Sequence, residues 1–393
     1  MDWIKEQTKV LHPELIEMRR DFHEHPELGF EEHRSAEIIV KYLEDLGLTT
    51  KRVAKTGVVA LIEGDPKGPV LMLRADMDAL PLQEENKVAY ASKNPGVMHA
   101  CGHDAHMTML LGAAKILTRM KEPLQGTIKL VFQPDEENAG ALPMIEDGVL
   151  ESPKVDGAIG VHIWTPLPSG TIGVSSGGIM SGLDVFQMKV TGYGGHSGYP
   201  ETAIDPIIAA SDIVVSAQRI QTRETSSMKP MTLVFGKING GTKANIIPDE
   251  VTLEGSIRTL YDDSEDPPIK RLKLLAENVA RVHHCECQLT WVRENIPLIN
   301  DVKLVSDILP VAKEVVEDEE KVIPYRTMAS EDFSEFTSRI PGVFLFLGTG
   351  NEGKETHFPH HNPRFNIDED VLPQGVELYV KGALNYLERN SKT

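Results

Sequence analysis

Apolar residues in the first fifty positions follow a helical spacing. Between residues 3 and 24 they recur every three to four positions, which predicts an amphipathic helix. The segment 35–48, SAEIIVKYLEDLGL, repeats this spacing, with Ser35 as a candidate N-cap and Gly47 as a candidate stop. The chain is therefore predicted to begin with two helices.

The pattern then changes to short apolar segments that are typical of strands. Strands are predicted over 57–64, 69–80, 126–137 and 157–164, and a long apolar helix is predicted over 107–120. Strands that alternate with helices in this way indicate a largely parallel sheet with helices on its faces.

From Leu183 onward the order of the predicted elements differs. The segments in chain order are strand 183–195, helix 205–221, strands 231–241 and 249–260, helix 267–284 and strand 286–292. A β-α-β-β-α-β order is that of the ferredoxin-like unit, so we expect a compact α+β domain here.

The first pattern resumes from Ile296, with a helix over 303–317, a strand over 342–348 and a closing helix over 368–389. We therefore predict an α/β domain, residues 1–183 and 296–393, with a mixed, mostly parallel sheet flanked by helices. A smaller ferredoxin-like α+β domain, residues 184–295, is inserted into it.

Composition and charge narrow the classes of function. The 393 residues suffice for two domains, and 59 acidic against 40 basic residues give a net charge of −19. This charge argues against nucleic acid or an anionic membrane surface as the partner, because both attract basic patches. No apolar segment approaches the ~20 residues of a membrane helix, and the N-terminus does not resemble a signal peptide. Three cysteines make no disulfide framework, so we expect a cytoplasmic protein.

Metal-binding residue types gather where the predicted strands end. Since ligand sites of open α/β sheets form at the carboxyl ends of the strands, these residues should converge. They are Asp76 and Asp78, Asp135, Glu136 and Glu137, His162, the stretch HACGHDAH at 99–106, and His357, His360 and His361.

Each of these residues, taken singly, has a plausible structural role. Asp76 and Asp78 could cap a loop, His162 could be a hydrogen-bonded core residue, and Cys101 could be a buried thiol. Five convergent segments nevertheless favour a metal site. Thiolate, imidazole and carboxylate together suit zinc-like ions better than calcium or magnesium. About five ligands fit two ions ~3.5–4 Å apart.

Within HACGHDAH, Cys101 and His103 are the candidate ligands. Asp104 is expected to orient a ligand or to cap the following helix. His106, one turn further on, is expected to support a ligand or to be packed, and His99 is the residue whose role is least defined. A second cluster, HHCEC at 283–287, lacks carboxylate partners in neighbouring segments. We expect its two histidines to complement the C-terminus of the preceding helix rather than to bind a metal.

A series of motifs runs in order along almost the whole chain. It includes RRDFHEHPELGFEE, LRADMDALP, MHACGHDAHMTMLLGAA, LVFQPDEENAGA, GVHIW, GYGGHSG, ANIIPDEVTLEGSIRT, SEDFS and HHNPRFNIDE. With these motifs the chain resembles the N-acyl-amino-acid amidohydrolase branch of the aminoacylase-like metallopeptidases. That branch includes hippurate hydrolase, bacterial aminoacylases and plant auxin-conjugate hydrolases.

The resemblance implies a site with two divalent metal ions, which could be zinc, manganese, cobalt or nickel. The ligands that it implies are Cys101, His103, Glu137, His162 and His361, with His360 as an alternative to the last. It further implies that Glu136 is the general base, and we place Asp78 in the catalytic group.

The resemblance also assigns the inserted domain a role as lid and dimerisation domain. His196 would reach the active site from the lid, often that of a partner subunit, and stabilise the oxyanion. Asn245 and Arg258 would hold the carboxylate of the substrate. A homodimer or homotetramer is implied. Two departures from the family pattern, Asp135 and Glu201, bear on substrate preference.

The predicted function is metal-dependent hydrolysis of N-acyl amino acids (acetyl, benzoyl or similar) to a carboxylic acid and a free amino acid. A metallo-carboxypeptidase or dipeptidase acting on short peptides could use the same site. A cysteine hydrolase with Cys101 as nucleophile and His103 or His106 as base would leave the other candidate ligands unexplained. A non-enzymatic metal-binding protein would leave Glu136 unexplained.

Overall fold

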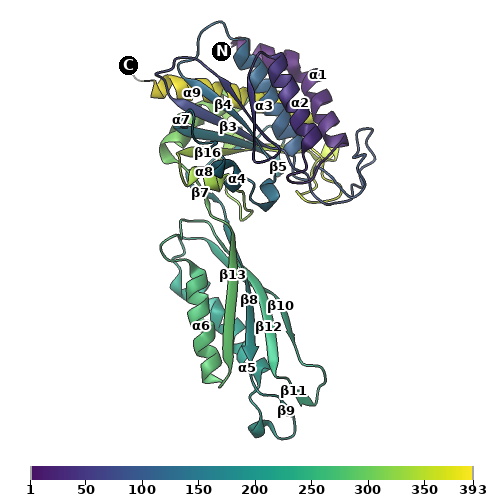
Figure 1. Ribbon diagram of the computed structural model, residues 1–393, viewed down its shortest axis with the longest axis vertical. Helices are drawn as coiled ribbons and strands as arrows, with labels where there is room; N and C mark the ends of the chain where they lie inside the picture. The colour runs from purple at the N-terminus through teal and green to yellow at the C-terminus, as the bar shows by residue number, and fades with distance from the viewer. Residues whose placement is uncertain (1, 392–393) are drawn as a thin grey trace. The chain divides into compact units, whose positions relative to one another are not determined.

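The computed structural model describes residues 2–391, which divide into two units (Figure 1). The first unit comprises the described residues up to Gly177, Ile299–Arg326 and those from Glu331 onward. The second comprises Gly178–Leu298 and Thr327–Ser330. Within residues 2–391, no helix combines the length and the apolar character needed to cross a bilayer.

An eight-stranded sheet forms the centre of the first unit, in the order β1-β2-β4-β3-β5-β16-β6-β15. The pairs β4–β3, β3–β5, β5–β16 and β6–β15 are parallel, and the other three pairs are antiparallel. The predicted mixed, mostly parallel sheet is thus confirmed. The strands are β1 (Thr50–Val53), β2 (Gly57–Ile62), β3 (Val70–Asp76), β4 (Thr127–Gln133), β5 (Gly157–Pro168), β6 (Ile172–Gly173), β15 (Val322–Ile323) and β16 (Gly342–Gly350).

Helices flank this sheet, and apolar residues such as Leu15, Leu110 and Val376 join those of the strands in one core (Figure 1). The helix predicted over 107–120 begins earlier, at His103, because Gly102 adopts a φ of +96° that turns the chain into the helix. The helices are α1 (Asp2–Glu24), α2 (His33–Asp45), α3 (His103–Thr118), α4 (Ala141–Glu146), α7 (Val302–Val315), α8 (Ser334–Thr337) and α9 (Leu372–Asn390).

Ser35 is not the N-cap of the second helix, contrary to the prediction. Helix α2 begins at His33, and Ser35 is buried inside its first turn. The carboxylate of Glu27 accepts the backbone N–H groups of Arg34 and Ser35 at 2.9 and 2.8 Å, and it also accepts the Ser35 hydroxyl. A glutamate from the preceding loop therefore satisfies the helix start, which local spacing does not reveal.

The second unit has the predicted β-α-β-β-α-β order, in an antiparallel sheet ordered β10-β12-β8-β13 (Figure 1). Apolar residues such as Phe186, Ile213 and Leu272 form its core. Its main elements are β8 (Gly182–Thr191), α5 (Pro206–Arg219), β10 (Met231–Gly240), β12 (Glu250–Thr259), α6 (Pro268–Val282) and β13 (Glu286–Asn295). The shorter strands are β9 (Gly195–His196) and β11 (Ile246–Ile247), and the linking segments contain β7 (Gly177–Met180) and β14 (Leu298–Asn300).

The HHCEC cluster is a structural feature of the second unit. Helix α6 ends at Val282, and Nε2 of His283 lies 3.0 Å from a carboxylate oxygen of Asp212 on α5. Cys285 is buried in the apolar core. Across residues 2–391, these side chains enter no group of ligand atoms close enough to hold a metal.

Candidate metal centre

The candidate ligands come from separate segments of the first unit. Strand β3 ends at Asp76, and Asp78 follows two residues later. Strand β4 ends at Gln133, and the next loop carries Glu136 and Glu137 in a one-turn 3-10 helix. Strand β5 contributes His162, and the segment before α3 contributes Cys101. The carboxyl ends of neighbouring strands therefore bring distant residues together, as expected for this class of sheet.

Among residues 2–391, five groups of three side chains could each hold a metal ion, and two of these groups share Cys101. Glu136 belongs to two of the others, one with His103 and Glu137 and one with Glu331 and Asp332. The ligand atoms of Cys101, His103 and His162 lie within 4.8 Å of one another, and so do those of Cys101, Glu137 and His361. Cys101 belongs to both groups, and its Sγ lies 3.6 Å from Nε2 of His162. A thiolate at this point could contact two ions at once. The fold thus brings all five sequence-predicted ligands together.

The two buried histidines are oriented by their Nδ1 atoms. Nδ1 of His103 donates to the backbone oxygen and to Oδ1 of Asp78, at 2.9 and 3.1 Å, and Nδ1 of His162 donates to the backbone oxygen of Ile163 at 2.6 Å. Nε2 of His103 is buried and has no hydrogen-bond partner among the described residues. A buried nitrogen of this kind requires a partner, and metal-binding histidines are commonly held through the other ring nitrogen. The donor set therefore fits a metal.

His361 and His360 have different environments. Nε2 of His361 lies 3.1 Å from Oε1 of Glu137, and the backbone of His361 has a φ of +63°. Nε2 of His360 accepts the backbone N–H of Thr165 at 3.4 Å, and its ring centroid lies 4.4 Å from that of Trp164. The geometry therefore groups His361, rather than His360, with the other candidate ligands.

The other polar residues of HACGHDAH are held differently. Nδ1 of His106 donates to Oδ1 of Asp76 at 2.5 Å, and Nε2 accepts a backbone N–H of β5 at 2.9 Å. Asp76, His103 and His106 also form a close group, but both ring nitrogens of His106 are already engaged. Asp104 accepts the next backbone N–H at the start of α3. His99 is buried, and neither of its ring nitrogens has a partner among the described residues.

Glu136 and Glu137 are adjacent in the chain, but their side chains lie in different environments. Oε1 of Glu136 accepts the backbone N–H of Asp332 at 3.3 Å. Burial, followed by neighbouring carboxylates, raises the pKa of Glu136 well above its usual value. Burial also opposes ionisation of Glu137, but His361 and His103 outweigh it and lower the pKa of that carboxyl. Glu137 is thus suited to bind a cation, and Glu136 to hold a proton.

The environment of Cys101 disfavours a free thiolate. Burial raises the pKa of the Cys101 thiol well above its usual value, and the carboxylates of Glu137 and Glu136 raise it further. His162 is the histidine whose nitrogen lies next to this sulfur, at 3.6 Å. The predicted rival, in which His103 or His106 activates a cysteine nucleophile, therefore lacks the contact that it requires.

A buried ionic cluster beside Glu136 was missed by the sequence reasoning. Arg74 is 2% exposed and contacts Asp76 at 2.6 Å, Glu331 at 2.9 Å and Asp332 at 3.1 Å. Its Nε also donates to Oε1 of Gln133 at 2.8 Å. The available signal was a lone arginine within the apolar strand LMLRAD, because an unpaired charge is rarely buried.

His196 and Asn245 lie close together in the second unit. His196 in β9 pairs with Ile246 in β11, and the backbone oxygen of Asn245 accepts the N–H of Ser197 at 3.3 Å. Nδ1 of His196 accepts the backbone N–H of Gly198 at 2.9 Å. This bond places the ring proton on Nε2, which can act as a donor.

Arg258 is not brought to the same place. It lies eight residues beyond Glu250, the first residue of β12, which at ~3.3 Å per residue is roughly 26 Å along the strand. Strands β9 and β11 lie beyond the other end of this sheet (Figure 1). Nη1 of Arg258 donates to the hydroxyl of Ser330 and to the backbone oxygen of Met328, both at 2.9 Å. Within one copy of this unit, His196 and Arg258 therefore cannot contact the same small ligand.

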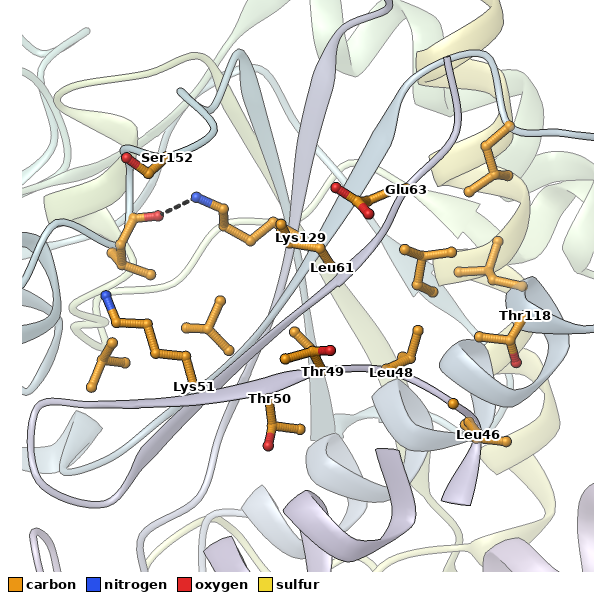
Figure 2. Close-up of a pocket in the computed structure, with 18 of the residues that line it drawn as sticks. Leu46, Leu48, Thr49, Thr50, Lys51, Leu61, Glu63, Thr118, Lys129 and Ser152 are labelled. Carbon is orange, nitrogen blue, oxygen red and sulfur yellow. Dashed lines mark hydrogen bonds between the residues drawn. The ribbon is translucent and has the colours of Figure 1, made fainter. Parts of the chain in front are cut away.

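A cavity of about 830 Å³ lies elsewhere in the first unit, along β1 and β2 (Figure 2). No candidate metal ligand lines it. Lys129 reaches into it (Figure 2), but its Nζ already donates to the backbone oxygens of Val149, Glu151 and Pro153 at 2.8–2.9 Å. This ammonium group is saturated, so we do not place the functional site in this cavity.

Comparison with known proteins places the chain in a family. Residues 72–385 match the family described as peptidase family M20/M25/M40. The chain is 38% identical to IAA-amino acid hydrolase ILR1-like 2 of Arabidopsis thaliana, over 99% of this chain and 92% of that protein. It is also 38% identical to N-acetyl-L-cysteine deacetylase of Bacillus subtilis, over 98% and 91% of the two chains.

The chain is also similar to a protein named as a carboxypeptidase and to a protein of known structure. The chain is 35% identical to thermostable carboxypeptidase 2 of Saccharolobus solfataricus, over 98% of both chains. The structure of the YXEP protein of Bacillus subtilis, described as a dinuclear metal binding peptidase, superposes with a TM-score of 0.84. It is 33% identical and covers 97% of this chain and 99% of that one.

Proposed function

The chain belongs to peptidase family M20/M25/M40, and from this premise we propose that it is a metal-dependent amidohydrolase that cleaves N-acyl amino acids. The products would be a carboxylic acid (acetic, benzoic or similar) and a free amino acid. One observation carries the proposal. Two groups of ligand atoms meet at Cys101, and Glu136, which belongs to neither of these two, has a carboxylate oxygen within 4.8 Å of ligand atoms of His103 and Glu137. The names of two relatives, an IAA-amino acid hydrolase and an N-acetyl-L-cysteine deacetylase, support this substrate class.

The donor set fits two divalent ions. Cys101, His103 and His162 would hold one ion, and Cys101, Glu137 and His361 would hold the other. Mixed sulfur, nitrogen and oxygen donors suit zinc, manganese, cobalt or nickel. When bound, the ions would supply Lewis-acid chemistry that activates water and polarises the amide carbonyl.

Glu136 would act as the general base and then as the general acid. Its carboxylate accepts a proton from the attacking water and passes it to the nitrogen of the leaving amino acid as the amide bond breaks. Asp78 would keep the ligands in place for this step. Its Oδ1 accepts the Nδ1–H of His103, and its Oδ2 accepts the backbone N–H of Glu137 at 3.1 Å.

The second unit would complete the site as a lid. His196 would donate from Nε2 to the developing oxyanion, and Asn245 and Arg258 would bind the carboxylate of the substrate. Because Arg258 and His196 lie at opposite ends of this unit, we propose that two copies of the chain contribute to one site in a homodimer or homotetramer. Exposed Ile208 and Val215 on α5 support such an assembly, and light scattering on the purified protein tests it.

Hydrolysis assays with and without metal test the proposed function. N-acetyl, N-benzoyl and indoleacetyl amino acids should be cleaved, and a chelator should abolish cleavage until Zn²⁺, Mn²⁺, Co²⁺ or Ni²⁺ is restored. Activity that survives complete metal removal would favour the cysteine hydrolase instead. Bound metal with no turnover on any substrate would favour a metal-binding protein without catalysis.

The second candidate function is that of a metallo-carboxypeptidase or dipeptidase. It is favoured by the likeness to thermostable carboxypeptidase 2, and its substrates also place an amide bond next to a free carboxylate. The same purified protein should be assayed on dipeptides and on N-acyl amino acids that share one C-terminal residue. A higher kcat/KM on the dipeptides would replace the first proposal by this one.

We also propose a cytoplasmic location. Cys101, Cys285 and Cys287 are all free thiols, and a thiol ligand is preserved best in a reducing compartment. Fractionation of cells that express the native protein tests this proposal.

A further inference from the structure

The loop that carries Glu136 and Glu137 has a disfavoured backbone shape. Asp135 has a φ of +52° and Ala139 a φ of +68°, both in the left-handed region that is unfavourable for residues with a side chain. Residues in this region keep their conformation only where the surrounding structure holds them. The fold must therefore supply contacts that fix residues 134–140.

Three buried carboxylates from three segments accept the backbone N–H groups of this loop. Glu32 accepts the N–H of Asp135 at 3.0 Å, and Asp78 accepts that of Glu137 at 3.1 Å. Asp332 accepts the N–H of Ala141, just after the loop, at 2.8 Å. The three acceptor residues are at most 2% exposed, so these bonds are shielded from water. The loop is thus held at its start, middle and end.

Asp332 has the widest set of contacts. Its two carboxylate oxygens each accept Nε2 of Gln133 at 2.8 Å, so it bonds residues on both sides of the loop. Oδ1 also lies 3.1 Å from Nη2 of Arg74. Its backbone N–H donates to Oε1 of Glu136 at 3.3 Å. Asp332 therefore contacts the residues on either side of the loop and also the carboxylate of the proposed base.

We infer that Asp332 and Glu32 are positioning residues, which hold the strained loop of residues 134–140 so that Glu136 faces the reacting atoms. The inference rests on the proposed function, because it assigns the loop a catalytic purpose. Neither residue would touch the substrate. Each would act through Glu136, and a displacement of about 1 Å at a reacting group can cost ~100-fold in rate.

Asparagine is a sharp test at position 332, because all the side-chain partners of Asp332 are donors. In asparagine, one of the two carboxylate oxygens is replaced by an NH₂ group, which would then face an N–H donor. We expect Asp332→Asn to lower kcat by ~10–100-fold with little change in KM and with the metal content retained. Asp307→Asn is the matched control. Asp307 is a buried acid of the same unit that pairs with Arg389 on α9, and its replacement should leave kcat unchanged.

Hydrogen exchange measures the loop without relying on activity. The amides of residues 135, 137 and 141 should exchange faster in Asp332→Asn than in the wild type, whereas those of α7 should be unchanged. Unchanged exchange in a folded Asp332→Asn protein, or unchanged kcat, would overturn the inference. If wild-type protein cleaves no N-acyl amino acid or dipeptide, the proposed function fails, but the exchange result still decides whether the loop is held.

Two further variants keep the inference testable. If Asp332→Asn does not fold, Glu32→Ala removes one acceptor and should show a smaller loss of kcat with the same faster exchange. Ala139→Gly should restore several-fold of the lost kcat in the Asp332→Asn background, because glycine adopts a positive φ without strain. A double variant that shows no recovery would overturn the role of the strained loop.

Discussion

The two units bury charge in different ways. In the second unit Arg293 donates to both Asp184 and Asp263, at 2.6–3.0 Å, so one cation is shared by two acids through two-pronged bonds. In the first unit Arg74 faces three carboxylates, and Glu136 lies beside them. Each additional buried acid around one cation is costly, so the cluster of the first unit is typical of a functional site. In the second unit both acids bond the cation through two oxygens each, which is typical of a structural scaffold.

This difference predicts in which unit the removal of an acid should change stability and in which it should change activity. Acids of the second unit are paired, so their removal should weaken the fold and leave the chemistry intact. Several acids of the first unit repel one another, so their removal should weaken the chemistry more than the fold. Each substitution in the first unit can therefore be compared with a matched substitution in the second.

The largest effect is expected for Glu136→Gln, which should lower kcat by ~10²–10⁴-fold because it removes the proton acceptor. Its unfolding temperature should be unchanged or higher, because glutamine replaces a buried carboxyl whose ionisation the burial and the neighbouring carboxylates oppose. Bound metal should stay the same. Steady-state kinetics, metal analysis and thermal unfolding measure these three quantities.

Asp263→Asn in the second unit is the control for this variant. Asp263 is buried and accepts from both Arg293 and Thr259, so its replacement should lower the unfolding temperature and leave kcat unchanged. A Glu136→Gln enzyme that retains turnover would remove Glu136 from the role of base.

The next effect is a loss of stability in Arg74→Met. Removal of this cation leaves three buried carboxylates uncompensated, and breaking a buried ionic cluster costs about 3–5 kcal/mol. Arg293→Met should cost less, because the Arg293 side chain is 27% exposed and its removal leaves two carboxylates unpaired rather than three. Urea denaturation of both variants measures the free energies of unfolding. Equal losses would contradict the proposed contrast between the units.

A smaller effect concerns pH. Burial raises the pKa of Glu32 to about 7, although Thr56 donates to its carboxylate. Because this folded-state pKa exceeds the unfolded value of about 4.5, the first unit should lose about 1–3 kcal/mol as the pH rises from 4.5 to 7. Glu32→Gln should remove this slope. Denaturation midpoints across that pH range measure it.

Glu224 in the second unit should contribute a dependence of stability on pH that has the opposite sign. Its hydrogen bond with Arg271 lowers the pKa of its carboxyl, so its contribution to stability is lost as the pH falls. Glu224→Gln should therefore remove stability at neutral pH and leave the slope of the first unit in place. If stability changed with pH equally in Glu32→Gln and in Glu224→Gln, Glu32 would not be the source of the slope.

The smallest effects are expected at two helix starts. Glu27→Ala in the first unit removes the acceptor for two backbone N–H groups of α2 and should cost about 1–2 kcal/mol. Asp205→Ala in the second unit removes one acceptor, for Ile207 at the start of α5, and should cost about 1 kcal/mol. Neither should alter kcat. A larger loss for Asp205→Ala would contradict the role of Glu27 as the acceptor for the first N–H groups of α2.

Most of the regular elements followed from the spacing of apolar residues. Buried strands such as β3 and β4 give continuous apolar segments, and the alternation of strands and helices predicted the mixed sheet. Short edge strands such as β1 and β15 were not predicted, because segments of four and two residues are too short to show a strand pattern. The start of α2 was misplaced because Glu27, which lies outside the local pattern, satisfies its N–H groups.

The kinds of candidate ligand and the edge of the sheet at which they gather could be predicted from the sequence, because side-chain types and strand ends are local properties. The tertiary structure alone decided which atoms meet. It placed His361 rather than His360 beside Glu137, and it made Cys101 common to two ligand groups. It also brought to Arg74 two acids, Glu331 and Asp332, that lie more than 250 residues away in the chain. Such contacts depend on the packing of distant segments to within a few ångströms, and no spacing along the chain encodes that distance.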